Sequence, residues 1–284
     1  MEAACSLTRE FLPAWLRIEA REIQIMKTMK TKTENVLVTG GGDSVGRVIA
    51  EAFLARGDKV HICDVNREAL DRTLLGNPAM RGTLADVSDP AAVARVFLEA
   101  RQWMGEVSVL VNNVGIGGPR GNIEDMDVAQ WQKTLDINVS GMLYCMQQAI
   151  PSMKAQKHGA IVNFSTGSTR TRLPMRTAYV VSKFAVEGLT LNAARELGPF
   201  NIRCNAILPG AINNARMRKI ISDRATELAR PVDEVTREVL KYISMKTMVE
   251  PSEIADMVLF LASGAAKKVT GELVSVSGNV EWEE

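Results

Sequence analysis

Histidine and cysteine are scarce in this chain, and their scarcity narrows the chemistry that it can perform. Among 284 residues there are two histidines, His61 and His158, so a histidine metal site or a serine–histidine–acid triad would depend on one of them. His61 lies in an apolar strand pattern and His158 in a predicted turn, where a structural role is usual. The four cysteines are far apart and form no Cys-x-x-Cys pair, which argues against a zinc site and a disulfide framework. We therefore expect no metal and a reducing, cytoplasmic location.

Long apolar runs and an excess of either charge are also missing. No apolar stretch approaches the roughly 18 residues that a membrane span needs, and Glu2, Arg9 and Glu10 interrupt the start, where a secretory signal would be apolar. The net charge of +1 provides no broad basic surface for a nucleic acid. With 46% hydrophobic residues, the chain can form one substantial core but is short for a second full domain. The sequence thus predicts one soluble domain that binds neither nucleic acid nor membrane.

Residues 1–34 differ in pattern from the rest of the chain, and we interpret them as an N-terminal extension to a domain over residues 35–284. The extension ends in a polar run of threonine and lysine, and its earlier part has only a weak helical pattern. Two interpretations are open. Either the natural start is at Met26 or Met29 and the residues before it are disordered, or an amphipathic helix over residues 11–25 covers a neighbouring subunit.

From residue 35 onward, short apolar runs rich in β-branched residues alternate with longer helical patterns. Such alternation is typical of stacked βαβ units, whose strands lie parallel in one sheet. The seven predicted strands are Val36–Thr39, Lys59–Cys63, Gly82–Ala85, Val107–Val111, Ala160–Ser165, Ile202–Ile207 and Leu273–Val276. Parallel strands need right-handed crossovers, so helices cover both faces and ligands bind beyond the carboxyl ends of the strands. The sequence therefore predicts an α/β fold with a doubly wound, seven-stranded parallel sheet flanked by helices.

A glycine-rich segment, TGGGDSVG over residues 39–46, directly follows the first predicted strand and opens a helical pattern. Glycines let a backbone turn tightly against a pyrophosphate that is held at a helix N-terminus. The second strand ends at Asp64, about 20 residues further on, where a carboxylate accepts hydrogen bonds from an adenosine ribose. Together with Asp43, this carboxylate would repel the 2′-phosphate of NADP. The pattern predicts a dinucleotide site that favours NAD, with a plain turn and a helix-capping Asp64 as the alternatives.

Six motifs, taken in order, resemble the single-domain short-chain dehydrogenase/reductase family over residues 35–280. They are the glycine loop with Ser44 in place of the family's middle glycine, Asp86-Val87 after the third strand, the NNVG segment over residues 112–115, Asn138, the YxxxK signature from Tyr179 to Lys183, and Pro209-Gly210. The resemblance implies a Rossmann-like fold and a hydride transfer between the nicotinamide of NAD and a secondary alcohol or carbonyl substrate. The cofactor-binding residues that it implies are Gly40, Ser44, Val45, Gly46, Asp64, Asp86, Val87, Asn113, Gly115, Tyr179, Lys183, Pro209, Gly210 and Ile212.

Tyr179 and Lys183 are four residues apart on a predicted helix and so share one face. An ammonium group beside a phenol favours the phenolate, which makes Tyr179 usable as an acid and base. The resemblance implies that Lys183 also holds the nicotinamide ribose and that Asn138 holds a water joining this lysine to solvent. The family's substrate-orienting hydroxyl, usually a serine thirteen positions before the tyrosine, falls on Thr166, with Ser165 as the alternative. We expect Thr166 to orient the substrate oxygen.

Arginines gather in two segments that would line a substrate pocket in such a protein. The loop before the catalytic helix contains Arg170, Arg172 and Arg176, and an expected substrate lid over residues 211–248 contains Arg216, Arg218 and Arg224. A guanidinium group binds a carboxylate, sulfonate or phosphate well, so an anionic hydroxy substrate is one interpretation. Solvated surface arginines are the other. Closure of the lid would exclude water during hydride transfer.

Two other functions are compatible with these patterns. An NADPH-dependent carbonyl reductase would differ only in its cofactor. A non-catalytic dinucleotide-binding regulator would keep the fold, but such proteins normally lack the tyrosine or the lysine, and both are present here. Small and apolar residues on more than one face of the helices around Asn138–Lys154 and Tyr179–Leu197 predict that these helices are buried, and the family resemblance implies that they pair across subunits. We expect a homotetramer, with a homodimer as the alternative.

Overall fold

The computed structural model describes residues 33–280. The predicted extension lies outside the described residues except for its last two, which belong to the compact unit that begins at Thr33. Glu34 is buried, and its backbone N–H donates to the Asp58 carboxylate over 2.9 Å. The folded domain therefore begins slightly before the predicted boundary at residue 35. Among the described helices, none is both long enough and apolar enough to cross a bilayer.

Seven parallel strands form one sheet in the order β3-β2-β1-β4-β5-β6-β7. Their bounds are β1 Asn35–Thr39, β2 Lys59–Asp64, β3 Arg81–Leu84, β4 Val109–Asn112, β5 Gly159–Phe164, β6 Ile202–Pro209 and β7 Leu273–Val276. The predicted doubly wound, seven-stranded parallel sheet is confirmed, and each predicted strand overlaps an observed one. β1 pairs with β2 on one side and with β4 on the other, so the strand order reverses here and opens a crevice beyond the carboxyl ends.

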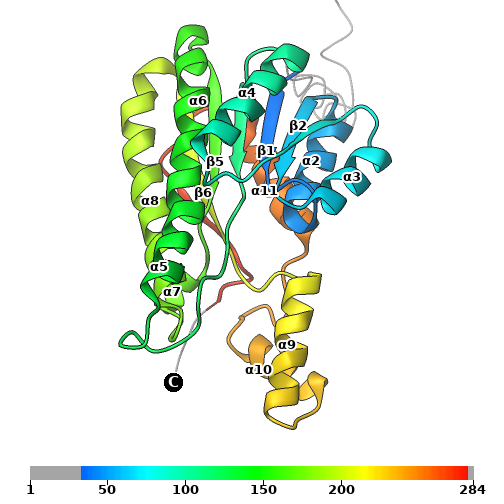
Figure 1. The fold of residues 1–284 in the computed structure, drawn as a ribbon, viewed down its shortest axis with the longest axis vertical. Coiled ribbons are helices and arrows are strands. Elements are labelled where there is room, and N and C mark those ends of the chain that lie inside the picture. Colours follow the sequence, from blue (N-terminus) through cyan, green and yellow to red (C-terminus); the bar gives the residue numbers. More distant parts are fainter. Residues whose placement is uncertain (1–32, 281–284) are drawn as a thin grey trace, which may run out of the picture. The chain divides into compact units, whose positions relative to one another are not determined.

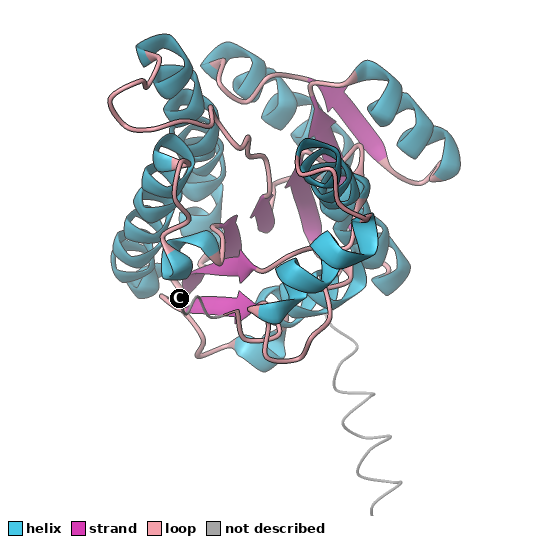
Figure 2. Ribbon diagram, turned by 90° about the horizontal axis from the view of Figure 1, so that it is seen from below, coloured by secondary structure: helices cyan, strands magenta, loops and turns pink. Residues whose placement is uncertain are grey.

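Helices cover both faces of the sheet (Figure 1), and Figure 2 shows the strands enclosed between them. The helices of one face are α4 (Pro90–Met104), α6 (Gly141–Gln156) and α8 (Thr177–Leu197). Those of the other are α2 (Ser44–Arg56), α3 (Arg67–Gly76) and α11 (Pro251–Ala262). Each set packs its own apolar core against the sheet, with Phe97 and Met146 on the first face and Phe53 and Leu261 on the second. Because both faces are covered, β4 and β5 are buried along their whole length.

Aspartate and asparagine residues cap several of these helices. Asp43, Asn66, Asp89 and Asp127 each accept a hydrogen bond from a backbone N–H in the first turn of α2, α3, α4 and α5 (Val128–Leu135), respectively. A π-helical turn, η1 (Asp136–Ser140), links α5 to α6, and the short helix α7 (Ser168–Thr171) precedes α8. These caps and turns begin the helices close to the strand ends, which positions the residues of the crevice.

Two helices between β6 and α11 form a small substructure of their own. They are α9 (Ala215–Glu227) and α10 (Val232–Lys241), and they share a cluster of Ile221, Ala225 and Val235. In Figure 1 they extend from the same end of the sheet as α5 and α7. Both helices lie within residues 211–248, for which the sequence predicts a substrate lid. A parallel bridge between Ile212 and Val249 ties the two ends of this segment together.

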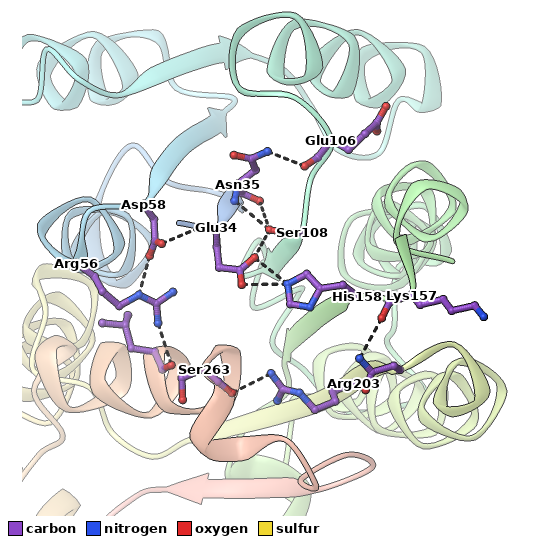
Figure 3. Close-up of polar contacts among 12 residues, drawn as sticks. Glu34, Asn35, Arg56, Asp58, Glu106, Ser108, Lys157, His158, Arg203 and Ser263 are labelled. Carbon is purple, nitrogen blue, oxygen red and sulfur yellow. Dashed lines mark hydrogen bonds and ion pairs between the residues drawn. The ribbon is translucent and has the colours of Figure 1, made fainter. Parts of the chain in front are cut away.

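The amino ends of the strands carry a network of polar side chains (Figure 3). Asp58 accepts a 2.7 Å hydrogen bond from the guanidinium of Arg56, in addition to the bond from the backbone of Glu34. The Glu34 carboxylate lies 3.0 Å from Nε2 of His158 and accepts a short hydrogen bond from the Ser108 hydroxyl. Residues before β1, β2, β4 and β5 are thereby joined, and His158 has the structural role that its sequence position predicts.

Candidate active site

A cleft of about 860 Å³ lies beyond the carboxyl ends of the strands, a size typical of sites for small molecules and cofactors. All fourteen cofactor-binding residues predicted from the sequence line it, and so does Thr166. Asn138 lies behind the wall of the cleft and is fully buried. The structure thus brings together residues from the ends of β1, β2, β4, β5 and β6, from the loop after β3 and from α8.

The backbone of the glycine loop between β1 and α2 leaves no room for side chains at its glycine positions. Gly40 has a φ of +64°, and a β-carbon on Gly46 would overlap the carbonyl oxygen of Gly40. Ser44, the first residue of α2, has a φ of +51°, a left-handed conformation that costs a non-glycine residue about 1–2 kcal/mol. Because Ser44, Val45 and Gly46 line the cleft, the N-terminus of α2 opens onto it. A pyrophosphate fits this cradle of backbone N–H groups.

Asp64, the last residue of β2, supports this loop from the side. Its carboxylate accepts hydrogen bonds from the backbone N–H groups of Gly42 at 3.0 Å and Asn66 at 2.9 Å. The cap of α3 is Asn66, whose side chain accepts from the N–H of Ala69. The alternative that Asp64 serves as the cap of α3 is therefore wrong. Its carboxylate instead lies at the edge of the cleft, beside the glycine loop.

Two further residues predicted to bind the cofactor use their side chains within the protein. Asp86 accepts from the N–H of Ser88 at 2.9 Å and from the hydroxyl of the same residue at 2.7 Å. Asn113 donates from its side-chain amide to the carbonyl groups of Thr39 at 3.0 Å and Gly40 at 3.2 Å. Asn113 thus fixes the glycine loop to the end of β4, and both residues shape the wall of the cleft.

Lys183 lies almost completely buried at the centre of the site. Its Nζ donates to the carbonyl of Phe164 over 2.7 Å and lies 6.0 Å from the centre of the Tyr179 ring. Burial, with a smaller contribution from the positive charge of Arg216, lowers the pKa of Lys183 to about 8. A β-carbon on Gly115 would stand 3.0 Å from Nζ, so the glycine leaves room for the ammonium group.

Asn138 joins the π-helical turn to the loop after β4 and to α8. Its Oδ1 accepts from the N–H of Ile116 at 2.8 Å, and its Nδ2 donates to the carbonyl of Ile116 and to the hydroxyl of Ser182, both at 2.9 Å. Both side-chain hydrogens are therefore already used. π-Helical turns are rare in proteins, and those that do occur are often found at functional sites. Here the turn places a fully buried amide beside the residue that precedes Lys183.

The structure distinguishes between the two candidate hydroxyls after β5. The hydroxyl of Ser165 points into the protein, where it contacts the carboxylate of Glu187 at 2.8 Å and the carbonyl of Lys183 at 3.3 Å. The hydroxyl of Thr166 has only local contacts, with the N–H and the hydroxyl of Ser168 at 3.2 and 3.3 Å. Thr166 is therefore the better placed of the two for a ligand in the cleft.

Comparison with known proteins agrees with this geometry. A profile of the family described as Enoyl-(Acyl carrier protein) reductase matches residues 40–280. The chain is 31% identical over 257 residues to 2-(S)-hydroxypropyl-CoM dehydrogenase 3 from Xanthobacter autotrophicus, a match that covers 88% of this chain and 98% of that protein. It is 32% identical over 256 residues to the 3alpha-hydroxysteroid dehydrogenase of Mediterraneibacter gnavus, with 88% and 98% covered. The chain belongs to the short-chain dehydrogenase/reductase family.

Solved structures support the same assignment. The structure of NAD+-bound xylitol dehydrogenase matches this short-chain dehydrogenase/reductase with a TM-score of 0.81 at 27% identity, covering 87% of this chain and 99% of the other. The predictions of family and fold are confirmed. The protein is an oxidoreductase that binds a nicotinamide cofactor and acts on CH–OH groups or the corresponding carbonyls.

In this short-chain dehydrogenase/reductase, a long-range contact that the sequence does not reveal lies at the glycine loop. Nδ2 of Asn214 donates to the hydroxyl of Ser44 over 3.1 Å, and Oδ1 of Asn214 caps α9 by accepting from the N–H of Met217 at 2.9 Å. Ser44 is the residue that replaces the family's middle glycine. The two side chains join the glycine loop to the start of α9. Because 170 positions separate them, no local pattern could have indicated the contact.

The structure also sorts the arginines that the sequence groups together. Arg170 pairs with the buried carboxylate of Glu187 at 3.5 Å, and Arg172 is exposed. Arg176 is half-buried, with its guanidinium carbon 5.9 Å from the centre of the Tyr179 ring. Of the three loop arginines, only Arg176 is therefore placed near the reacting groups. Arg170 instead supports α8 through its ion pair with Glu187.

Proposed function

We propose that this short-chain dehydrogenase/reductase uses NAD and transfers a hydride between its nicotinamide and a secondary alcohol or carbonyl substrate. When bound, the nicotinamide accepts a hydride in one direction and gives it back in the other. The observation that supports NAD over NADP is the Asp64 carboxylate at the edge of the cleft, next to the glycine loop. A 2′-phosphate placed there would meet a negative charge and would be repelled.

In the proposed reaction, Tyr179 takes the proton from the substrate hydroxyl during oxidation and returns it to the carbonyl oxygen during reduction. The hydroxyl of Thr166 orients the substrate oxygen by a hydrogen bond. The ammonium of Lys183, 6.0 Å from the centre of the tyrosine ring, stabilises the negative charge on the phenolate oxygen and holds the ribose next to the nicotinamide. Its low pKa leaves Lys183 able to exchange protons close to neutral pH.

Asn138 acts in this proposal as a positioning residue. The family resemblance implies that it holds a water that joins Lys183 to solvent, but both of its side-chain hydrogens go to Ile116 and Ser182. We assign the side chain the task of fixing α8 against the loop after β4.

The cofactor preference can be tested by calorimetric titration with NADH and NADPH. We expect NADH to bind the wild type at least about tenfold more tightly, a difference of about 1.4 kcal/mol. Asp64→Asn removes the charge and keeps an acceptor oxygen for one of the two N–H groups, those of Gly42 and Asn66, so it should narrow this ratio. Asp71→Asn, at an exposed position of α3, removes the same charge and should leave the ratio unchanged.

A cofactor ratio in the wild type that favours NADPH would replace this proposal with the alternative, an NADPH-dependent carbonyl reductase. If a dinucleotide binds tightly but neither NAD nor NADP reacts with any alcohol or carbonyl compound, the result would favour the non-catalytic regulator. The presence of Tyr179 and Lys183 on one face of α8, both lining the cleft, argues against that third function.

We also propose that the protein is a homotetramer, with a homodimer as the alternative. Four apolar side chains on the outer faces of α6 and α8 are exposed by 39–46%, namely Leu143, Val181, Phe184 and Leu191. Apolar residues gathered on neighbouring helices favour an interface between copies. Light scattering at micromolar concentration should give two or four times the mass of 31.0 kDa, and a monomer would contradict the proposal.

A further inference from the structure

Two arginine side chains from different elements meet at Gly117, in the loop after β4. A terminal nitrogen of Arg176 lies 2.5 Å, and one of Arg216 lies 2.7 Å, from the position that a β-carbon on Gly117 would occupy. The two nitrogens are thus no further apart than the sum of these distances, about 5.2 Å. Arg176 directly precedes α8, and Arg216 is the second residue of α9. Because Gly117 has no side chain, both guanidinium groups fit over it.

Neither arginine pairs with a carboxylate among residues 33–280. Four cations of the segment from α9 to α10 do have such partners, namely Lys219 and Arg224 in α9, Arg230 between the helices and Arg237 in α10. Arg218 of α9 instead donates to the side-chain oxygen of Asn213. The pKa of Arg176 is lowered by its burial and by the nearby positive charges of Arg216 and Arg120, with only Tyr179 acting in the opposite direction. Like charges at this separation repel each other, and an anion between them would turn the repulsion into attraction.

The pair lies next to the reacting groups. The guanidinium carbon of Arg176 is 5.9 Å from the centre of the Tyr179 ring, and the charge of Arg216 acts on Lys183. Arg216 lines the same cleft as the two catalytic side chains. An anionic group held by both arginines would therefore belong to a molecule small enough to place its alcohol carbon at Tyr179.

We propose that Arg176 and Arg216 form a binding site for the carboxylate or sulfonate of a short hydroxy acid that reacts at Tyr179. This inference rests on the proposed function and names its substrate class. Planar guanidinium groups present parallel N–H donors that match such oxygens. Because Arg216 belongs to α9, the bound anion would also hold the lid segment, residues 211–248, against the loop that contains Gly117.

The dinucleotide pyrophosphate is a competing source of negative charge for these arginines. The glycine loop and the N-terminus of α2 already provide a cradle for the pyrophosphate, and neither arginine belongs to that cradle. The test therefore measures binding of the cofactor and of the acid separately.

The experiment is calorimetric titration of the NADH-saturated protein with 3-hydroxybutanoate and 4-hydroxypentanoate, each compared with its methyl ester. An alcohol does not react with NADH, so binding is measured without turnover. We expect the wild type to bind at least one of the acids about ten- to hundredfold more tightly than its ester, as a charged hydrogen bond requires. High salt should reduce this preference, because salt screens the attraction.

The variants Arg176→Gln and Arg216→Gln should each bring the acid and ester within about threefold of each other. Gly117→Ala, which keeps both charges but places a methyl group between them, should also reduce the preference. The matched control is Arg224→Gln, which removes the same charge from α9 at a residue paired with Glu227, and it should retain the preference. Melting curves of all variants establish that each one is folded.

Three results would overturn the proposal. One is that neither acid binds the wild type more tightly than its ester. A second is that both glutamine variants keep the preference. A third is that they weaken NADH binding while the preference stays intact, which would assign the pair to the pyrophosphate. Absence of NADH binding to the wild type would overturn the proposed function together with this site, whereas tight NADH binding without a preference for the acid overturns this site alone.

Discussion

Two buried carboxylates at the amino ends of the strands have partner side chains, whereas several cationic side chains at the carboxyl ends have no carboxylate partner among the described residues. At the amino ends, Asp58 contacts Arg56 at 2.7 Å and Glu34 contacts His158 at 3.0 Å. At the carboxyl ends, the ammonium of Lys183 is buried against a backbone carbonyl, and no carboxylate pairs with it among the described residues. Arg176 lies beside a second arginine there. Both ends belong to the same sheet, so the difference is one of function and not of fold.

The difference shows that the two ends serve different purposes. The side-chain contacts at the amino ends satisfy the buried carboxylates and join the starts of four strands, which stabilises the domain. Unpaired positive charges at the carboxyl ends leave folding less favourable but remain available to a phenolate, a ribose hydroxyl or an anion. We therefore expect substitutions at the carboxyl ends to reduce activity and substitutions at the amino ends to reduce stability.

The largest effect is expected from Lys183→Met. Removing the ammonium should lower kcat/KM by about 10³-fold, because the phenolate and the ribose lose their partner. The same substitution should stabilise the fold at pH 7 by about 2 kcal/mol. The pKa of Lys183 is about 8 in the fold and 10.5 as a free group, a difference worth about 3 kcal/mol, and the lost hydrogen bond to Phe164 offsets about 1 kcal/mol of this.

The pH dependence of that gain has a defined sign. Folding disfavours the protonated lysine, so the penalty is fully present below pH 8 and disappears as the pH rises to about 10.5. Urea unfolding at pH 7 and pH 10 should therefore show the stabilisation of Lys183→Met at the lower pH only. Lys268→Met, at an exposed position, should change neither stability nor activity. A destabilised Lys183→Met variant at pH 7 would contradict the account of the carboxyl ends.

The opposite result is expected from Asp58→Ala at the amino ends. The side chain of Asp58 is 2% exposed, and its loss leaves Nε of Arg56 and the N–H of Glu34 without their acceptor. Breaking such a buried pair should cost about 3 kcal/mol of unfolding free energy. The folded variant should keep kcat/KM within about twofold of the wild type. Asp233→Ala, which breaks an exposed pair with Arg237, should cost no more than about 0.5 kcal/mol.

A smaller difference in unfolding free energy, between two variants of Ser44, tests whether the backbone is strained at the carboxyl ends of the strands. Ser44 has a φ of +51°, so Ser44→Gly should be more stable than Ser44→Ala by about 1 kcal/mol. Both variants lose the hydrogen bond from Asn214, so their comparison isolates the backbone contribution. Equal unfolding free energies for the two variants would show that the left-handed conformation carries no cost at this position.

Much of the fold can be predicted because it depends on local patterns. The bounds of β2 and β7 reflect runs of apolar and β-branched residues, and the glycine loop and the tyrosine–lysine pair each lie within a few positions of the sequence. The predicted start of β4 is two residues before Val109, since Val107 is apolar and buried but lies before the first paired position.

The rest depends on contacts between distant residues, which no local pattern reveals. The sequence places Arg170 and Arg176 in one loop, and only the short helix α7 decides that the first faces Glu187 while the second approaches Tyr179. The pairing of Glu34 with His158 spans 124 positions, so the sequence pattern leaves Glu34 outside the domain. The inward contacts of the Ser165 hydroxyl and the local contacts of the Thr166 hydroxyl likewise result from the path of the chain after β5.

The measurement that tests the central claim most directly is the rate of NADH formation by Tyr179→Phe, with NADH binding measured on the same preparation. The assay uses the best alcohol from a panel of hydroxy acids, sugars, steroids and aryl alcohols. The account predicts a rate at least about 10²-fold below the wild type with an unchanged Kd for NADH, because only the proton-transferring oxygen is removed. A variant that retains more than about a tenth of the wild-type rate, a barrier change under about 1.4 kcal/mol, would contradict the role of Tyr179.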